Sequence, residues 1–193
     1  MSSTFGGDLP MPPVPGQPRA ETLAPLPAHS RAQTLIRTLD LAPHPEGGWY
    51  REVFRSRDLV LPGAGRPPRP ALTTIDFLLA RGQFSAWHRV LSDEVWHLLE
   101  GGPLRLWLMP PTAEVLLPGA PASMTSVLLS IDTRLRHVVP AGWWQAAETQ
   151  ADFAYVGATV APGFDFADFS FGRDDANFVS ALARQQADLA RLL

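Results

Sequence analysis

The stretch from Gly82 to Gly101 holds the residues of this chain that are best suited to chemistry. His88 and Glu94 stand on either side of the short Leu91-Ser92-Asp93 turn, in a run typical of two short strands. A histidine and a carboxylate on adjacent strands can face the same barrel interior. Such a pair can bind a metal ion or act as a general acid and base. We therefore predict His88 and Glu94 as catalytic residues.

Three further charged residues are candidates for binding a ligand. Glu46 precedes Gly47-Gly48, a pair suited to unusual backbone angles or to close approach by a ligand. Arg51 and Arg89 can each clamp a carboxylate or phosphate with two hydrogen bonds. The alternatives are a solvated connector for Glu46 and surface ion pairs for the two arginines.

The composition removes several kinds of catalyst and partner. The chain has 193 residues, no Cys, and 16 basic residues that are all Arg. It therefore offers no thiolate metal site, Cys nucleophile, Schiff-base lysine or Walker-type lysine. A net charge of -3 without a basic cluster argues against nucleic acid as a partner. No apolar stretch approaches the roughly 20 residues of a membrane span, and the start lacks a secretory pattern, so we expect no membrane partner and a cytoplasmic location.

The elements that position these residues are short strands. From residue 49 to about 160, runs with a period of two alternate with Pro or Gly, which favours an all-β sandwich or barrel over βαβ units. Nine strands are predicted: 49–56, 71–80, 84–90, 94–101, 104–110, 113–119, 126–132, 135–140 and 152–160.

Helices are predicted at both ends of this strand region. Ser30 caps a short amphipathic helix over residues 30–41, and apolar spacing predicts a second helix over residues 174–193. Residues 1–30 are rich in Pro, Gly, Ser and Ala, a composition typical of a disordered tail. Residues 31–193 are then a single domain. The loop over residues 61–70 is interpreted as a surface excursion.

The strand pair around His88 resembles the first sequence motif of the cupins. That motif has the form G-x5-H-x-H-x3-E-x6-G, and Gly82, His88, Glu94 and Gly101 fall in register with it. Val90 stands where the second His belongs.

The second cupin motif, G-x5-P-x-G-x2-H-x3-N, follows about 40 residues later. Pro140 and Gly142 match it. Gln145 replaces the third His, Arg134 the leading Gly and Thr149 the Asn.

A narrower resemblance covers about residues 33 to 172. The blocks 45–52 (PEGGWYRE), 87–97, 139–145 (VPAGWWQ) and 161–169 look like the cupin-5 family, DUF985. The resemblance implies an RmlC-like, double-stranded jelly-roll β-barrel with a pocket at its mouth, which usually forms a homodimer. It implies no settled reaction.

The resemblance also raises the question of a metal ion. Metal-binding cupins present three His and one Glu, whereas this chain has His88, Val90, Glu94 and Gln145 at those positions. Valine cannot ligate, and an amide oxygen is a poor ligand beside imidazole. His97 should point away from Glu94 unless a bulge intervenes. A divalent ion on His88, Glu94 and Gln145 is therefore the less favoured alternative, and no cofactor is certain.

Aromatic residues accompany every matched block. Trp87, Trp144 and Phe164 are predicted, with Gln145 and His97, to line a pocket with apolar walls. Most aromatic residues of a sandwich are nonetheless core. Trp143 and Trp144 cannot both face inward from an extended segment. His44 and His137 are interpreted as ordinary surface or loop residues.

These observations predict a cupin-fold protein that binds a small polar metabolite in the barrel. The first hypothesis is an epimerase- or isomerase-like enzyme in which His88 acts as base or acid and Glu94 orients it. The alternatives are a non-catalytic binding or sensing module, or a divalent-metal enzyme with a degenerate site. In a purely structural interpretation, His88 and Glu94 only satisfy each other's hydrogen-bonding groups inside a former metal site.

Overall fold

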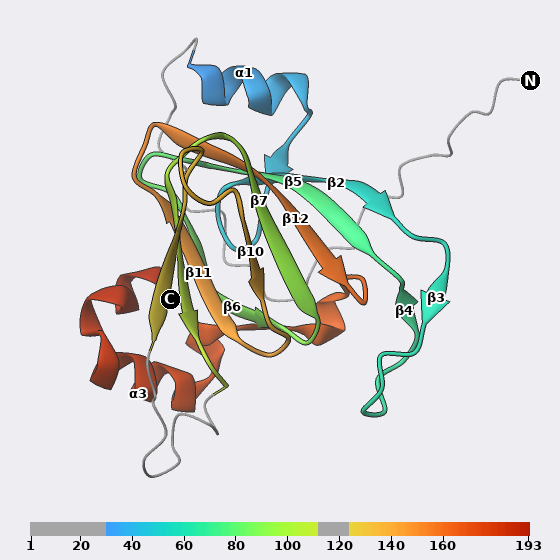
Figure 1. Cartoon of the computed structure of the whole chain (residues 1–193). Coiled ribbons are helices and arrows are strands. Elements are labelled where there is room, and N and C mark those ends of the chain that lie inside the picture. Colours follow the sequence, from blue (N-terminus) through green and yellow to red (C-terminus); the bar gives the residue numbers. More distant parts are fainter. Residues whose placement is uncertain (1–29, 112–123) are drawn as a thin grey trace, which may run out of the picture.

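Two antiparallel sheets lie face to face in this computed structural model, which describes residues 30–111 and 124–193 (Figure 1). The six-stranded sheet runs in the order β1 (Ala42–Pro43), β2 (Trp49–Arg55), β5 (Thr73–Ala80), β12 (Phe153–Ala161), β7 (Asp93–Gly101) and β10 (Arg136–Val139). The five-stranded sheet runs in the order β13 (Phe169–Phe171), β6 (Phe84–Val90), β11 (Trp144–Thr149), β8 (Leu104–Met109) and β9 (Thr125–Leu129). Every pairing is antiparallel, which confirms the all-β jelly roll.

The core between the sheets follows from the alternation of side chains along the strands. On β7, Glu94, Trp96 and Leu98 are buried, while the residues between them are partly exposed. The apolar members of this set pack with residues of both sheets, such as Phe77 and Leu106. A polar residue at position 94 therefore points into the space between the sheets, beside this core.

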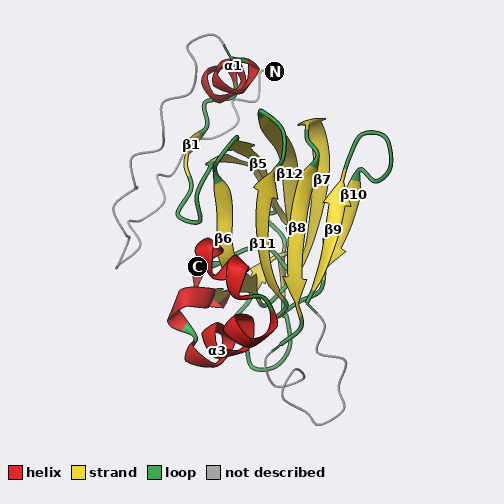
Figure 2. Ribbon diagram, turned by 90° about the vertical axis from the view of Figure 1, so that its left-hand side faces the viewer, coloured by secondary structure: helices red, strands yellow, loops and turns green. Residues whose placement is uncertain are grey.

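Two helices flank the sheets, the N-terminal one at one end of the strands and the C-terminal one beside the five-stranded sheet (Figure 2). Helix α1 (Arg31–Thr38) begins where the Ser30 hydroxyl accepts from the amide of Gln33, and it packs Leu35 against Leu78 of β5. Helix α3 (Ala176–Gln185), capped by Asp175, packs Phe178 on the outer face of the five-stranded sheet. Short 3-10 turns lie at Phe166–Asp168, Gly172–Asp174 and Ala187–Leu192. No helix within the two described ranges is long and apolar enough to cross a membrane.

The structure differs from the sequence-based expectation in several elements. The single helix expected over 174–193 is interrupted at Gln186, whose φ of -156° and ψ of 76° end α3. Strand β11 was not predicted because both of its faces are buried, so its sequence lacks alternation. The excursion at 61–70 belongs to a small hairpin of β3 (Leu59–Val60) and β4 (Arg69–Pro70). The predicted tail, except Ser30, and the predicted strand 113–119 lie outside the described residues.

Candidate functional site

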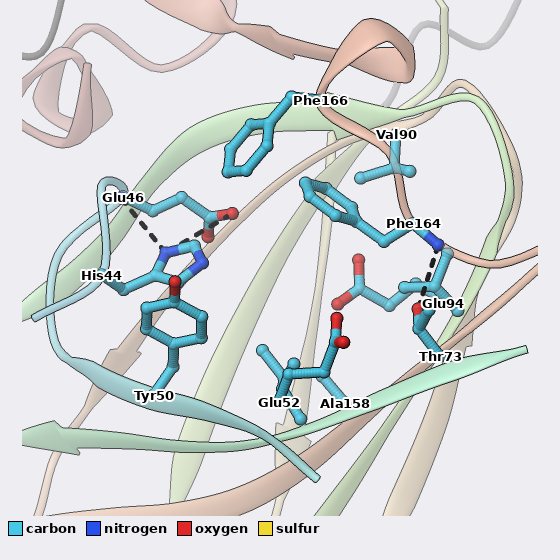
Figure 3. Close-up of a pocket in the computed structure, with 12 residues that line it drawn as sticks. His44, Glu46, Tyr50, Glu52, Thr73, Val90, Glu94, Ala158, Phe164 and Phe166 are labelled. Atoms are coloured by element: carbon cyan, nitrogen blue, oxygen red, sulfur yellow. Dashed lines mark hydrogen bonds and ion pairs between the residues drawn. The ribbon is translucent and has the colours of Figure 1, made fainter. Parts of the chain in front are cut away.

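A pocket of about 520 Å³, including the part that opens to solvent, lies at one end of the space between the sheets (Figure 3). Its walls come from the segment before β2, from strands β2, β5, β6, β7 and β12, and from the loop after β12. Apolar side chains form most of the lining, with Tyr50, Phe164 and Phe166 as its aromatic members. Its polar members are His44, Glu46, Glu52, Thr73 and Glu94. An apolar pocket with a few convergent polar groups is typical of small-molecule sites.

Glu46 reaches this pocket because two glycines let its segment cross close to β6. Gly47 and Gly48 have φ values of 110° and 71°. A Cβ atom on Gly47 would lie 2.2 Å from the carbonyl oxygen of Phe84, so no larger residue fits there. The backbone carbonyl of Glu46 also accepts from the amide of Ala86, at 2.9 Å. The Gly-Gly pair therefore holds the Glu46 carboxylate at the barrel.

A bulge in β6 brings Ser85 and His88 to the same carboxylate. His88 pairs with Gln145 of β11 and Ser85 pairs with Ala147, so three steps on β6 match two on β11. Without this shift, residues 85 and 88 would face opposite sides of the sheet. The Ser85 hydroxyl donates to Glu46 Oε2 at 2.7 Å, and His88 Nδ1 lies 3.3 Å from the same oxygen.

The neighbours of the two imidazoles fix which nitrogen carries hydrogen. Nδ1 of His88 faces the carbonyl of Ala86 at 2.8 Å and the Glu46 carboxylate, both of which only accept, so Nδ1 carries a hydrogen. Nδ1 of His44 accepts from the Glu46 amide at 3.2 Å, so its hydrogen is on Nε2. Burial lowers the pKa of His44, against a smaller raising effect of Glu46. His44 is therefore a neutral ring at pH 7.

Glu94 projects into the pocket from β7, and only one of its two carboxyl oxygens has a hydrogen-bond partner among the described residues. Gln145 Nε2 donates to Glu94 Oε2, while Gln145 Oε1 accepts from the Trp96 indole at 2.9 Å. Glu94 is 7% exposed. Burial raises the pKa of Glu94 to about 7, although the charge of His88 and the hydrogen bond from Gln145 lower it and Glu46 raises it further. Glu94 is thus a carboxyl group that gains or loses a proton near neutral pH.

A buried ion cluster supports the aromatic wall of the pocket. Arg69 binds both carboxylate oxygens of Asp168, at 2.7 and 3.1 Å, and Arg66 binds Oδ2 at 2.7 Å. Burial opposes ionisation of Asp168, but the hydrogen bonds from these arginines lower its pKa below the usual value. The cluster ties the β3–β4 hairpin to the 3-10 turn that carries Phe166. The Phe164 amide also donates to the Thr73 hydroxyl at 2.9 Å.

The structure brings together some of the predicted site residues. Glu46, Glu94 and Phe164 line the pocket, and Gln145 contacts Glu94 directly. His88 is outside the lining and contacts Glu46, so the hydrogen-bonded partner expected from sequence, Glu94, is replaced by Glu46. The reason is the β6 bulge together with the close crossing of the Gly47-Gly48 segment.

The other predicted ligand contacts lie elsewhere. Trp87 and Trp144 are fully buried against Phe178 of α3, on the opposite face of the five-stranded sheet from Gln145. Arg89 lies over the Trp144 ring on that same face, 4.6 Å from its centroid. Strand alternation explains this, because neighbours of an inward residue point outward.

Two more candidates face away from the pocket on the six-stranded sheet. Arg51 is exposed on β2 and lies 4.0 Å from Asp76. His97 lies on the face of β7 opposite Glu94, as alternation predicts. The expectation that Arg51, Trp87, Arg89, His97 and Trp144 line the pocket therefore does not match its geometry.

Sequence reasoning missed His44, interpreted above as a surface or loop residue. Its side chain is only 9% exposed, lines the pocket and meets the Tyr50 ring edge to face at 4.4 Å. The Gly47-Gly48 pair could have indicated this position, because it lets the turn that carries His44 lie close to β6. Tyr50 and Glu52 were also missed as lining residues.

The residues at the cupin ligand positions do not suit a divalent metal ion. Gln145 turns its NH₂ group toward Glu94, because its oxygen accepts from Trp96. Val90 has no ligand atom, which leaves His88 as the one imidazole at these four positions. Within the described ranges, no group of three or more His, Asp or Glu side chains is arranged to hold a metal. We derive no step through a metal.

Comparison with known proteins gives the same fold. A hypothetical protein from Leishmania major is 32% identical, with a TM-score of 0.72, and the match covers 84% of this chain and 98% of that one. Protein SO0799 from Shewanella oneidensis is 30% identical, with a TM-score of 0.67, and the match covers 84% and 97% of the two chains. No protein of curated function matches the sequence. The family model described as Cupin superfamily (DUF985) matches residues 33–172, and the chain belongs to that family.

Proposed function

We propose that this protein binds a small organic molecule in the pocket and moves a proton on it, with Glu94 as the acid-base group. The observation that carries the proposal is the position of Glu94, which lines the pocket and has a pKa raised to about 7. A catalytic acid or base works best when its pKa lies near the working pH. Perturbed carboxyl groups in pockets are characteristic of active sites.

The surroundings of Glu94 suit both halves of a proton transfer. Glu94 Oε2 accepts from Gln145, which leaves Oε1 without a hydrogen-bond partner among the described residues. The carboxyl group can give its proton to a bound molecule, and the N–H of Gln145 then stabilises the carboxylate. In an epimerase- or isomerase-type reaction, a C–H bond beside a carbonyl breaks, the proton moves to Glu94, and it returns to the same or a neighbouring atom. This sequence balances without a co-reactant.

The roles proposed for His88 and Glu94 follow their positions. His88 touches Glu46 and stacks on Phe169 at 5.5 Å, so it acts as a positioning residue for Glu46. Glu94 takes the acid-base role because it lines the pocket and His88 does not.

A non-catalytic binding module is the second candidate. It is favoured by the way that Ser85, His88 and the Gly47-Gly48 segment hold Glu46, because a fixed carboxylate suits recognition as well as catalysis. Such a module needs no group that exchanges protons with its ligand.

A screen followed by deuterium exchange separates the two candidates. The full chain is screened for small metabolites that raise its melting temperature. Each hit is then incubated in D₂O, and its C–H signals are followed by NMR. We expect the wild type to exchange a C–H proton of a hit, with a rate that depends on a group of pKa near 7. Glu94→Gln should slow the exchange by about 100-fold or more.

Glu100→Gln is the matched control, because Glu100 lies on the same strand and pairs with Arg31 at the surface. Its exchange rate should equal that of the wild type. Hits that bind without any exchange would establish the binding module, and the absence of any hit would overturn both candidates.

The homodimer and the cytoplasmic location stay predictions from the sequence. Light scattering on the purified full chain tests the first, and a mass of one 21.1 kDa chain would overturn it.

A further inference from the structure

The charge of the pocket lining is one-sided. Three of the lining residues are carboxylates, Glu46, Glu52 and Glu94, and none is Arg. The chain contains no Lys. The lining imidazole of His44 is neutral, because burial lowers its pKa. The lining therefore presents no positive charge to a ligand.

Arg55 contacts two of the lining residues and is already bound to protein groups. Arg55 donates to both carboxylate oxygens of Glu52, at 2.9 and 2.6 Å, and to the carbonyl of Phe164 at 3.1 Å. This arrangement neutralises Glu52 and uses the donors with which Arg55 could clamp an anion. An anionic ligand would meet the Glu46 carboxylate with no arginine or lysine in the lining to pair with.

Two carboxylate oxygens in the pocket still need a donor. Glu46 has a side chain that is 9% exposed, and its Oε1 makes no hydrogen bond to the described residues. His44 Nδ1 lies 3.8 Å from this oxygen, but it already accepts from a backbone amide and cannot donate. Glu94 Oε1 is likewise without a partner among the described residues. Both oxygens can therefore accept a hydrogen bond from a ligand or from water in the pocket.

Aromatic rings complete the surroundings of these oxygens. Phe164 and Phe166 lie edge to face, with centroids 5.0 Å apart, and Figure 3 shows them on one side of Glu46 and Glu94 with Tyr50 on the other. The negative faces of aromatic rings attract organic cations, and their apolar bodies pack against the carbon chain of a ligand.

We infer that the ligand of this pocket carries a protonated amine, whose N–H groups donate to Glu46 Oε1 and whose carbon skeleton packs between Tyr50 and the two phenylalanines. The inference rests on the proposed binding function and names its substrate class. A neutral alcohol could donate to the same oxygen, but it would lack the attraction between opposite charges that an ammonium group adds.

Three probes of the same carbon skeleton test the charge. Butylammonium, butanol and butyrate are titrated at pH 7 into the isotope-labelled full chain, and binding is followed by NMR shifts of pocket residues. We expect butylammonium to bind at least tenfold more tightly than either of the others, because a hydrogen bond between two charged groups is the strong kind. Equal affinities, or tighter binding of butyrate, would overturn the inference.

The Glu46→Gln variant tests whether the charge that binds butylammonium is that of Glu46. The amide still accepts from Ser85, so we expect it to fold, and butylammonium should bind about tenfold more weakly, to the level of butanol. Glu100→Gln serves again as the control and should bind butylammonium like the wild type. An unchanged affinity in Glu46→Gln would overturn the assignment to Glu46.

The two proposals fail in different ways. If the metabolite screen gives anionic or neutral hits that exchange protons through Glu94, the amine inference is wrong and the proposed function stands. If neither the screen nor the three probes give binding at the pocket, both are wrong.

Discussion

The stability of this protein should depend on pH through Glu94, and replacing Glu94 by Gln should remove that dependence. The pKa of Glu94 is raised from 4.5 to about 7, with burial as the main cause. At about 1.4 kcal/mol per pKa unit, this shift corresponds to about 3 kcal/mol of folding free energy. Because Glu94 is only 7% exposed, solvent screens little of this effect.

The sign follows from which form the pocket favours. Between pH 4.5 and 7 the native protein keeps a proton on Glu94 that the unfolded chain has lost. The contribution of Glu94 to stability is therefore complete below pH 4.5 and is lost as the pH rises through about 7. In Glu94→Gln the side chain is always neutral and its oxygen can still accept from Gln145, so the substitution removes the titration and keeps the hydrogen bond.

The assay is urea unfolding of wild type and Glu94→Gln at half-unit steps from pH 4 to pH 8.5. Titrating groups that do not interact with Glu94 contribute equally to both proteins, so the quantity of interest is the difference between their free energies of unfolding. We expect Glu94→Gln to gain about 3 kcal/mol relative to the wild type between the two ends of the range. Parallel curves, with a difference that stays within about 0.5 kcal/mol, would refute the argument.

Two further predictions concern the supports of the pocket and the sheet. Asp168→Asn should lower the free energy of unfolding by about 3 kcal/mol, because it leaves Arg69 without its charged partner. It should also weaken the binding of any pocket ligand, because it frees the turn that carries Phe166. Urea unfolding checks the first effect, and a loss below about 1 kcal/mol would contradict it. Phe178→Ala should lower the free energy of unfolding by about 3 to 5 kcal/mol, because Phe178 fills the space between the sheet and α3. Asn177→Ala, on the exposed side of the helix, is the control. Similar melting temperatures for these two variants would contradict the prediction.

Much of the fold could be predicted because local patterns in the sequence indicate its strands and helices. Strands β7 and β12 alternate between buried and more exposed residues, and Ser30 precedes a helical spacing, so strands and α1 were placed within a few residues. The prediction failed where tertiary contacts override the local pattern. Strand β11 is covered on both faces, and the terminal helix breaks at Gln186, where no proline or glycine marks the end.

The candidate site was predicted less well, for a geometric reason. Sequence spacing placed Glu94 and His97 on opposite faces of one strand, because alternation is a local rule. It could not show that β6 is shifted by a bulge at Ala86 and Trp87, which turns His88 toward Glu46. Nor could it show which of the tryptophans lie under α3.

The sequence by itself determined the class of the protein. Its strand pattern, its Gly, His, Glu and Pro spacings and its lack of Cys and Lys defined a jelly roll whose chemistry rests on carboxylates and imidazoles. Only the tertiary structure decided which of these groups meet. His44 and Glu46 come from one segment and Glu94 from another far along the chain, and the fold places them around one pocket. Burial at that place then shifts the pKa of Glu94, because desolvation depends on the packed surroundings and not on the neighbours in sequence.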